Sequence, residues 1–227
     1  MQSLNHVDVI RSLKGRGGSA VERSLPINKP EGKVVGWLIP ITDKLADNDE
    51  IVDSLVKWRQ KYMHVFLTQF KPSRERTRNW LKNTVIIDDS RILFLVLDED
   101  RQLTGNYGVC NICRETAELD NTIRGEKRGD RRLMFYSELC LMNWLYNEVG
   151  VNEIYVQVCS SNTKAIEHHR SVGFSITAHY ELIEKVVDGE KTYQVGPMIE
   201  HIDAERGLVR MDIDRESFFR DYPWLRS

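Results

Sequence analysis

The chain has 227 residues, of which 41% are hydrophobic and 29% charged, and its formal net charge is −2. A chain of this length can bury a sizeable core, and it carries no overall positive charge that would attract nucleic acid or an anionic membrane. We therefore predict a globular protein whose principal partners are neither nucleic acids nor membranes. No stretch approaches the ~20 apolar residues that cross a bilayer, and the first residues lack the apolar core of a secretion signal, so a cytoplasmic location is expected.

The N-terminal segment, residues 1–32, mixes glycine, proline, serine and charge without an apolar period. Such a composition predicts a flexible arm, with room for a short helix around residues 4–13. Order is expected to begin at residues 34–41, an apolar run of strand length. Two helices with apolar residues near helical spacing follow, and Ser73 is placed to cap the second of them.

The later elements predict one domain over residues 33–200 with a packed C-terminal extension over residues 201–227. They are, in order, strands over 91–98, 103–112 and 115–123, a long helix over 130–149, a strand over 153–160, a short helix over 162–172, and strands near 174–184 and 191–198. The fold class is α/β (α+β), with a mixed central sheet of about seven strands flanked by about four helices.

Four cysteines include a C-x-x-C pair, Cys110 and Cys113. A zinc site needs a second pair of ligands at usable spacing, and the sequence offers none. Both cysteines fall near a predicted strand, where positions three apart point to opposite faces. We interpret them as small buried residues and predict no metal.

The turn IRGEKRGDRRLM, residues 123–134, joins a predicted strand to the long helix. Free N–H groups and the helix dipole favour an anion at such a junction, and Gly125 and Gly129 permit bends that point N–H groups inward. Residues 124–132 carry five positive and two negative charges. The turn is a candidate phosphate-binding site, and a basic turn that only faces solvent is the alternative.

The short helix begins at Asn162, whose side chain can cap its first turn. Asn162, Ala165, Ile166 and His169 lie at i, i+3, i+4 and i+7 and share one stripe. His168 points about 100° away from His169. A stripe of this kind can face a ligand, and a capping asparagine with a histidine at the core edge is the alternative.

Together these two segments resemble the GNAT superfamily of acyl-CoA-dependent N-acyltransferases. NTKAIEHHRSVGF matches the family motif N-x-x-A-x-x-φ-Y-x-x-φ-G-F at Asn162, Ala165, Gly173 and Phe174. ELDNTIRGEKRGDRRLM occupies the slot of the family's pyrophosphate-binding turn with the right spacing. The resemblance covers about residues 34–198 and implies a single GNAT-like domain.

The resemblance implies acetyl-CoA or another short acyl-CoA as cofactor, held by the turn and by the two helix starts. The cofactor-binding residues it implies are Asn121, Ile123, Arg124, Gly125, Lys127, Arg128, Gly129, Asp130, Arg131, Arg132, Asn162, Ala165 and Ile166. The turn departs from the family pattern, because Arg131 and Leu133 stand where the family has glycines.

Catalysis is expected where the family's fourth strand separates from the fifth, with an N–H around Leu119 to Asn121 polarising the thioester carbonyl. His169 replaces the tyrosine that the family uses as an acid for the departing thiolate. An imidazolium with a pKa near ~6.5 can protonate a thiolate of pKa near ~8.5, so His169 is a candidate acid. Glu118 and Asp120 share one face of the strand, and either can accept the proton of the amine, with Asp120 the first candidate.

The segment before these motifs resembles bacterial GNAT enzymes that acylate nucleotide-linked aminosugars, in which two early helices wall the acceptor pocket. The candidate substrate-binding residues are Trp58, Arg59, Tyr62, His64, Phe66 and Phe70. Aromatic rings can stack on a base or sugar, and arginine can bind phosphates. Aromatic residues at helical spacing usually pack in a core, which is the alternative for Trp58 and Phe66.

The predicted function is therefore acyl transfer to a small-molecule nucleotide-sugar substrate, with a homodimer left open. Two alternatives stay open. One is a GNAT enzyme acting on a protein N-terminus, a lysine or a small amine, and the other is a catalytically silent fold that binds acyl-CoA.

Overall fold

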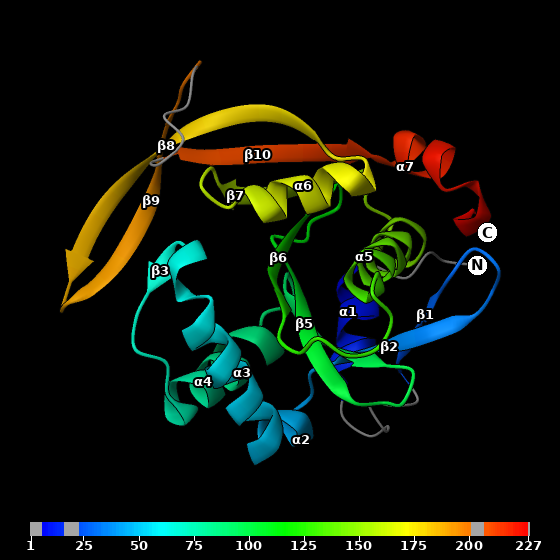
Figure 1. The fold of residues 1–227 in the computed structure, drawn as a ribbon, viewed down its shortest axis with the longest axis horizontal. Coiled ribbons are helices and arrows are strands. Elements are labelled where there is room, and N and C mark those ends of the chain that lie inside the picture. Colours follow the sequence, from blue (N-terminus) through cyan, green and yellow to red (C-terminus); the bar gives the residue numbers. More distant parts are fainter. Residues whose placement is uncertain (1–5, 16–22, 201–206, 227) are drawn as a thin grey trace.

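One mixed sheet of ten strands runs through the molecule (Figure 1). The computed structural model describes residues 6–15, 23–200 and 207–226. The strands are β1 (Leu25–Asn28), β2 (Val34–Pro40), β3 (Thr68–Gln69), β4 (Ile92–Asp98), β5 (Leu103–Cys110), β6 (Thr116–Arg124), β7 (Glu153–Cys159), β8 (Ser175–Val187), β9 (Glu190–Met198) and β10 (Gly207–Asp214). Their order is β1-β2-β4-β5-β6-β7-β10-β8-β9-β3, and among the described strands β6 with β7 is the one parallel pair. The seven predicted strands are all present, and β1, β3 and β10 are additional.

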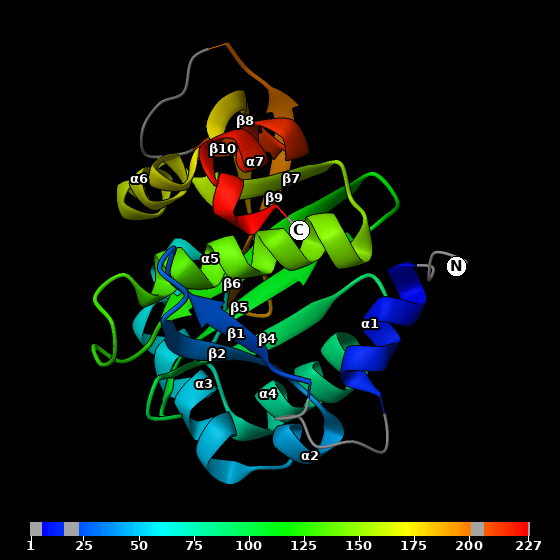
Figure 2. The ribbon, with the colours of Figure 1, turned by 90° about the vertical axis from the view of Figure 1, so that its right-hand side faces the viewer.

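Helices cover both faces of the sheet (Figure 2). They are α1 (His6–Lys14), α2 (Asp43–Ala46), α3 (Asp49–Lys61), α4 (Arg74–Trp80), α5 (Leu133–Trp144), α6 (Thr163–Val172) and α7 (Arg215–Asp221). The first core cluster joins the sheet to α1, α5, α6 and α7, and the second joins it to α2, α3 and α4. Short π-helical turns extend α4 and α5 through Ile86 and Val149. Of the helices that the structure describes, none combines the length and apolar character needed to cross a membrane.

Strand β4 shows why the sheet has a core on each face. Alternate side chains of a strand point to opposite faces, so a strand covered on both sides needs apolar residues throughout. Ile92, Phe94 and Val96 enter the first core cluster, whereas Leu93 and Leu95 enter the second. The run ILFLVL is continuously apolar because both faces of β4 are buried.

The described part of the N-terminal segment differs from the flexible arm that its composition predicts. Helix α1 buries Ile10 completely, and β1 buries Ile27 completely at the edge of the sheet beside β2. Arg11 pairs with Asp89, at 2.5 Å. One apolar anchor in each short element is enough here, because the rest of the fold supplies the surface that it packs on.

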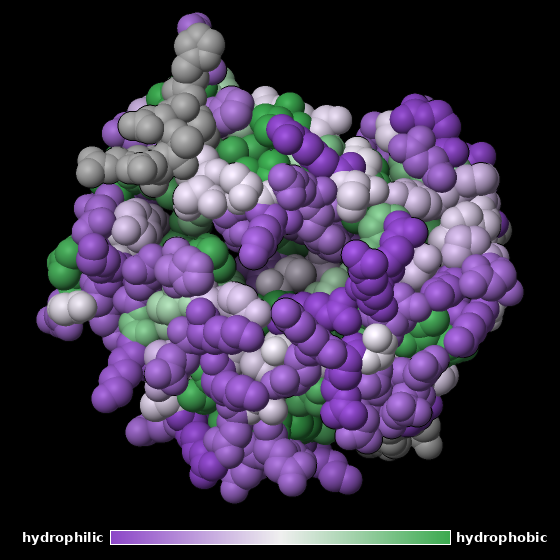
Figure 3. Space-filling model, in the orientation of Figure 1, coloured by the Kyte–Doolittle hydropathy of each residue, from purple (hydrophilic) through white to green (hydrophobic). Residues whose placement is uncertain are grey.

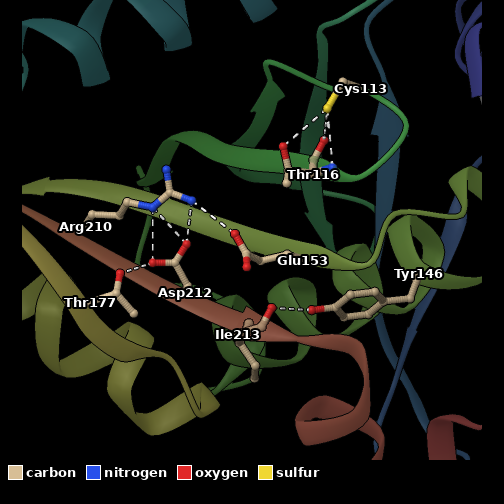
Figure 4. Close-up of polar contacts among 8 residues, drawn as sticks. All are labelled: Cys113, Thr116, Tyr146, Glu153, Thr177, Arg210, Asp212 and Ile213. Atoms are coloured by element: carbon tan, nitrogen blue, oxygen red, sulfur yellow. Dashed lines mark hydrogen bonds and ion pairs between the residues drawn. The ribbon is translucent and has the colours of Figure 1, made fainter.

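The C-terminal segment enters the sheet. Strand β10 lies between β7 and β8 and pairs with both, so it is an internal strand where the sequence predicted a packed extension. The hydroxyl of Tyr146, from the π-helical turn after α5, donates a hydrogen bond of 2.8 Å to the carbonyl of Ile213 on β10 (Figure 4). In the same figure Arg210 of β10 bridges Asp212 on its own strand and Glu153 on β7.

Strands β6 and β7 run side by side only over their first halves. Parallel pairing joins residues 116–119 to residues 153–156 and ends there. Beyond this point β6 is bulged against β5, and Asn121 adopts a left-handed conformation with φ of 47°. A bulge bends its strand, so the second halves of β6 and β7 separate, as the family resemblance implies.

The two cysteines of the C-x-x-C pair differ in their environments. Cys110 is buried at the end of β5, whereas Cys113 is exposed in the turn before β6. Cys113 accepts a hydrogen bond from the backbone N–H of Thr116 and contacts its hydroxyl (Figure 4). The interpretation as a buried residue is therefore correct for Cys110 and wrong for Cys113, because the strand ends between them.

Candidate active site

Three adjoining hollows surround the point where β6 and β7 separate. The large hollow, about 800 Å³, lies between the end of β6, the start of α5 and α6. The strand hollow, about 270 Å³, lies between β6 and β7. The arginine hollow, about 310 Å³, lies between α3, α4 and the strands β5 and β6. Figure 3 shows the face between α6 and α3, which is hollowed near its centre and has a mostly hydrophilic rim.

The turn before α5 is organised by the guanidinium of Arg124. This side chain donates to the carbonyls of Arg131 (2.8 Å), Arg128 (3.1 Å) and Asp130 (3.1 Å). The N–H groups of Gly125 and Glu126 both donate to the carbonyl of Thr104, at 2.9 Å. These predicted anion contacts are thus already engaged inside the protein, and Arg124 shapes the turn.

Gly125 is required in this turn for steric reasons. A Cβ atom at this position would lie 1.9 Å from the ring of Trp58, so only glycine lets the turn pass over that side chain. Gly125 is buried, whereas Lys127 and Gly129 are exposed, and none of the three is among the residues that line a hollow. The indole of Trp58 donates to the carboxylate of Glu126, at 3.2 Å.

Asp130 serves the first turn of α5. Its carboxylate accepts from the backbone N–H of Arg132 (2.7 Å) and pairs with Lys29 (2.8 Å), and these contacts hold its pKa below the ordinary value although burial opposes them. Arg128 pairs with the buried Asp98, at 3.3 Å. The cationic side chains of the turn that line the large hollow are therefore those of Arg124, Arg131 and Arg132.

Helix α6 brings its predicted stripe to the hollows. Asn162 accepts a hydrogen bond from the N–H of Ala165 (3.3 Å), and both residues line the large and the strand hollows. Ile166 is buried in the first core cluster and lines neither. Gly173 ends the helix in a left-handed conformation, φ 112°, which few other residues adopt without strain.

The histidine pair surrounds a carboxylate of α5. Glu138 is fully buried, and its oxygens lie 2.8 Å from Nδ1 of His169 and 2.6 Å from Nε2 of His168. The hydroxyl of Tyr107 on β5 donates to the same carboxylate, at 2.7 Å. Burial alone would raise the pKa of Glu138, but the charges and hydrogen bonds of the two histidines outweigh it and hold the pKa well below the usual range. His169 is 5% exposed and lines both the large and the strand hollows.

Both candidate bases lie in the strand hollow. Asp120 accepts from the backbone N–H of Asn121 (2.6 Å) and pairs with Arg91 (3.2 Å). The N–H of Asn121 is thus already engaged within β6. Burial raises the pKa of Glu118, a hydrogen bond from Asn111 opposes the shift, and the charge of Asp120 adds to it. A carboxylate with a raised pKa is a stronger base.

Of the six residues predicted to bind the acceptor substrate, one packs in the core and the others line the hollows. Trp58 is 1% exposed and packs in the second core cluster, so the structural alternative holds for this residue. Tyr62, His64 and Phe66 line the large hollow, and Phe70 lines the arginine hollow. The hydroxyl of Tyr62 also donates to the carbonyl of Arg124, at 3.4 Å.

Arg59 reaches the wall that the strand and arginine hollows share. Its guanidinium lies 3.6 Å from the ring centroid of Phe66 and donates to the carbonyl of Thr68, at 3.0 Å. Burial lowers the pKa of Arg59 to about 10, so the group stays charged at neutral pH. Among the described residues, no carboxylate forms an ion pair with Arg59, although the charge of Asp120 acts on it from farther away, and its Nε has no hydrogen-bond partner.

Asn106 on β5 faces the arginine hollow with one end of its amide. It is 3% exposed, and its NH₂ group donates to the carbonyl of Asn121, which fixes the orientation of the amide. Its Oδ1 is buried and has no partner among the residues that the structure describes. Asn106 and Arg59, which carry this acceptor and this donor, both line the arginine hollow.

Several of these residues escape sequence reasoning. Glu138 and Tyr107 lie 31 residues apart, so their contact is visible only in the fold. The one available signal is the polar pair Ser137–Glu138 inside the apolar run LMFYSELCLMNWLY, because a carboxylate is rarely buried without partners. Asn106 stands in a predicted strand without any local signal of its role.

Comparison with known proteins agrees with this geometry. The sequence model of the acetyltransferase (GNAT) domain matches residues 46–187, and no curated protein sequence matches the chain. One similar solved structure is a probable acetyltransferase of the GNAT family from Chromobacterium violaceum, with a TM-score of 0.64 and 13% identity over 90% of this chain and 91% of that one. A second is RimL, a ribosomal L7/L12 alpha-N-protein acetyltransferase in complex with coenzyme A (TM-score 0.64, 10% identity, 86% and 99% covered). A third is FdhC, a nucleotide-linked sugar GNAT (TM-score 0.59, 10% identity, 85% and 96% covered). At these identities the likeness shows a shared fold.

Proposed function

This chain belongs to the GNAT acetyltransferase family, and from that premise we propose that it transfers an acetyl or other short acyl group from acyl-CoA to the amino group of a nucleotide-linked aminosugar. The proposal joins three features of the described residues: the separation of β6 from β7, the large hollow beside it, and the arginine hollow behind it. The large hollow and the gap between the strands would hold acyl-CoA, and the arginine hollow would hold the acceptor.

The large and strand hollows fit acyl-CoA. A long, anionic molecule needs a cationic rim and a narrow path inward, and the large hollow has Arg131, Arg132 and Lys164 on its walls. It adjoins the strand hollow through Asn162, Ala165 and other shared residues. Because Gly125 and Glu126 donate to Thr104, arginine and lysine side chains take a larger share of phosphate binding than backbone N–H groups.

The protein's own groups supply the proton transfers. When bound, the thioester supplies an activated acyl carbon and a sulfur leaving group, and the amide C–N bond replaces the C–S bond. Asp120, or Glu118 in its place, accepts the proton that the amine nitrogen loses. Nε2 of His169 gives a proton to the departing sulfur. The reaction is then balanced, with one proton taken up by a carboxylate and one released by an imidazolium.

Arg59 is the observation that carries the choice of acceptor. A buried guanidinium without a carboxylate partner is costly unless a ligand supplies the counter-charge. Its planar fork suits a phosphate, and the aromatic rings of Phe70 and Trp80 line the same hollow. A nucleotide-linked aminosugar offers an amine, a diphosphate and a flat base in one molecule.

Thiol release in the presence of acetyl-CoA tests the proposal. The panel contains dTDP- and UDP-linked aminosugars, the same aminosugars without the nucleotide, peptides with free N-termini, and polyamines. We expect the highest kcat/KM with a nucleotide-linked sugar and a large loss when the nucleotide is removed.

Turnover confined to peptides or polyamines would overturn the choice of acceptor and leave the acyl transfer intact. Tight coenzyme A binding without turnover on any amine would instead support a catalytically silent fold.

A further inference from the structure

Glu138 is an acidic side chain in the interior of the protein, where a charge does not contribute to solubility. It lies on α5 among apolar residues, with 0% exposure, and three polar groups from β5 and α6 converge on it. A buried carboxylate with several partners contributes little net stability compared with apolar packing. The cluster therefore calls for a role other than holding the fold together.

The proton positions around Glu138 follow from chemistry. Its pKa is held well below the usual range, so the carboxylate is ionised and can only accept hydrogen bonds. Burial, followed by the charge and hydrogen bond of Glu138, raises the pKa of Tyr107 well above its usual value, so this hydroxyl stays protonated and donates. His169 must likewise carry a proton on Nδ1, because that atom lies 2.8 Å from Oε1 of the carboxylate.

This arrangement fixes which nitrogen of His169 faces the hollows. The two ring nitrogens lie on opposite sides of an imidazole, so Nε2 is directed away from Glu138. Phe174 and His168 contact the ring edge to face, with centroids 5.5 and 5.3 Å away, and restrict its rotation. His169 is also part of the wall of the large and strand hollows.

We propose that Glu138 is a positioning residue, which binds the Nδ1–H of His169 and so holds Nε2 toward the departing sulfur, to which the imidazolium gives its Nε2 proton. The inference rests on the proposed acyl transfer, but not on which amine accepts the group. Glu138 itself touches neither substrate and acts through His169.

Other charged groups near this pair bear on any pH dependence. Glu138 faces Tyr107 from β5 and both histidines from α6, and its charge reaches Tyr222 after α7. Burial alone would lower the pKa of His168, but Glu138 outweighs it and raises the pKa. The groups that share the strand hollow with His169 are Glu118, Asp120, Arg59 and Cys159.

A metal ion is the competing interpretation of the same three side chains. One ligand atom from each of Glu138, His168 and His169 lies within 4.8 Å of the others, which no other such group of the described residues achieves. Nδ1 of His169 and the hydroxyl of Tyr107 make hydrogen bonds of 2.8 and 2.7 Å to the carboxylate, which engage both of its oxygens. Nε2 of His168 lies 2.6 Å from the same carboxylate as an ion pair and makes no hydrogen bond with it. We therefore assign the cluster to proton positioning.

The Glu138→Gln variant tests this role, with Glu167→Gln as its matched control. Glu167 is an exposed residue of α6, so its variant makes the same charge change on the surface. We expect Glu138→Gln to lower kcat by about 10- to 100-fold with little change in KM for acyl-CoA, because a misoriented acid impairs the chemical step and not binding.

A double variant separates positioning from structure. In a His169→Phe background, Glu138→Gln should lower kcat no further, because Glu138 has no imidazole left to orient. An additional loss there, or a kcat unchanged in the single variant, would overturn the proposal. Loss of activity on chelation that is restored by Zn²⁺ would overturn it in favour of a metal site.

Nitrogen-15 NMR of the wild-type chain supplies a test that needs no acceptor, with the His169→Phe variant used only to assign the signals. Signals of His169, identified by their absence in His169→Phe, should show a protonated Nδ1 throughout the titration. A neutral Nε2–H form would contradict the proposal even if an acyl acceptor is found. The Nδ1–H form in a chain without transferase activity would place the failure in the proposed function instead.

Discussion

Arg59 links the acceptor hypothesis to one side chain. It is charged, stacked on Phe66, and without a described carboxylate partner, while the neighbouring Arg76 pairs with Glu190. Nε of Arg59 is a donor without a partner, and Oδ1 of Asn106 is an acceptor without a partner. A ligand that binds both must carry an anionic group and a hydrogen-bond donor. A sugar phosphate meets both needs, whereas a hydrocarbon amine supplies a donor but no anion.

Arg59→Met should therefore raise KM for the nucleotide-linked sugar by about 10- to 100-fold, the equivalent of losing a hydrogen bond to a charged group. KM for acyl-CoA should rise less than KM for the sugar, since Arg59 lines the arginine and strand hollows but not the large hollow with its cationic rim. Arg74→Met is the control, because Arg74 pairs with Asp53 at the surface and is not a lining residue. Steady-state kinetics with both substrates varied makes the measurement, and equal rises in the two KM values would contradict the assignment.

Variants of Trp58 and Phe70 distinguish a packing role from a binding role, because the sequence predicts both residues as contacts of the acceptor. Trp58→Ala should lower the free energy of unfolding by ~3–5 kcal/mol, because it empties a large buried site. Phe70→Ala should instead raise KM for the acceptor with a small effect on stability, as this ring lines the arginine hollow. Chemical denaturation and kinetics on both variants make the comparison. A stable Trp58→Ala protein with a raised KM would return Trp58 to the binding site.

The roles of single residues could be predicted where they follow from motif spacing, but not where they depend on tertiary contacts. Helical periodicity places Asn162, Ala165 and His169 on one stripe, and the family resemblance directs this stripe to the cofactor; in the structure all three residues line the hollows. Within the described residues, the ion-pair partners of the charged residues in the turn could not be foreseen. Asp98 and Lys29 are distant in sequence, and they engage Arg128 and Asp130 only after folding.

At the scale of elements, β10 determines how the site is supported. The apolar residues Val209 and Met211 alternate with polar ones, and the strand completes the sheet between β7 and β8. The sequence predicts a packed extension over this segment, whereas the structure places an internal strand there. The two long strands β8 and β9 form a hairpin that projects from the body (Figure 1).

Val209→Asp tests the place of β10 in the core, and Val195→Asp on β9 is the matched control. Val209 is 3% exposed, so its variant buries an unpaired charge and should lower the free energy of unfolding by about 4 kcal/mol or more. Val195 is 43% exposed, and its variant should stay within about 0.5 kcal/mol of the parent. Urea denaturation followed by circular dichroism measures both. Equal stability of the two variants would show that β10 is dispensable.

At the scale of the molecule, the proposed function assigns acyl-CoA and the acceptor to hollows on opposite faces of the sheet. Helices α5 and α6 flank the large hollow, whereas α3 and α4 wall the arginine hollow, and the separated strands β6 and β7 lie between them. The order of helices and strands followed from periodicity, because each pattern is local. The positions of the hollows did not, since they depend on a bulge at Asn121 and on contacts between distant elements.

A crystal structure with a non-hydrolysable acyl-CoA analogue tests the central claim most directly. We predict the phosphates beside Arg131 and Arg132, the pantetheine arm between the second halves of β6 and β7, and the sulfur within hydrogen-bond distance of Nε2 of His169. Density for the analogue on another surface, or a sulfur on the far side of β6 from His169, would contradict the account.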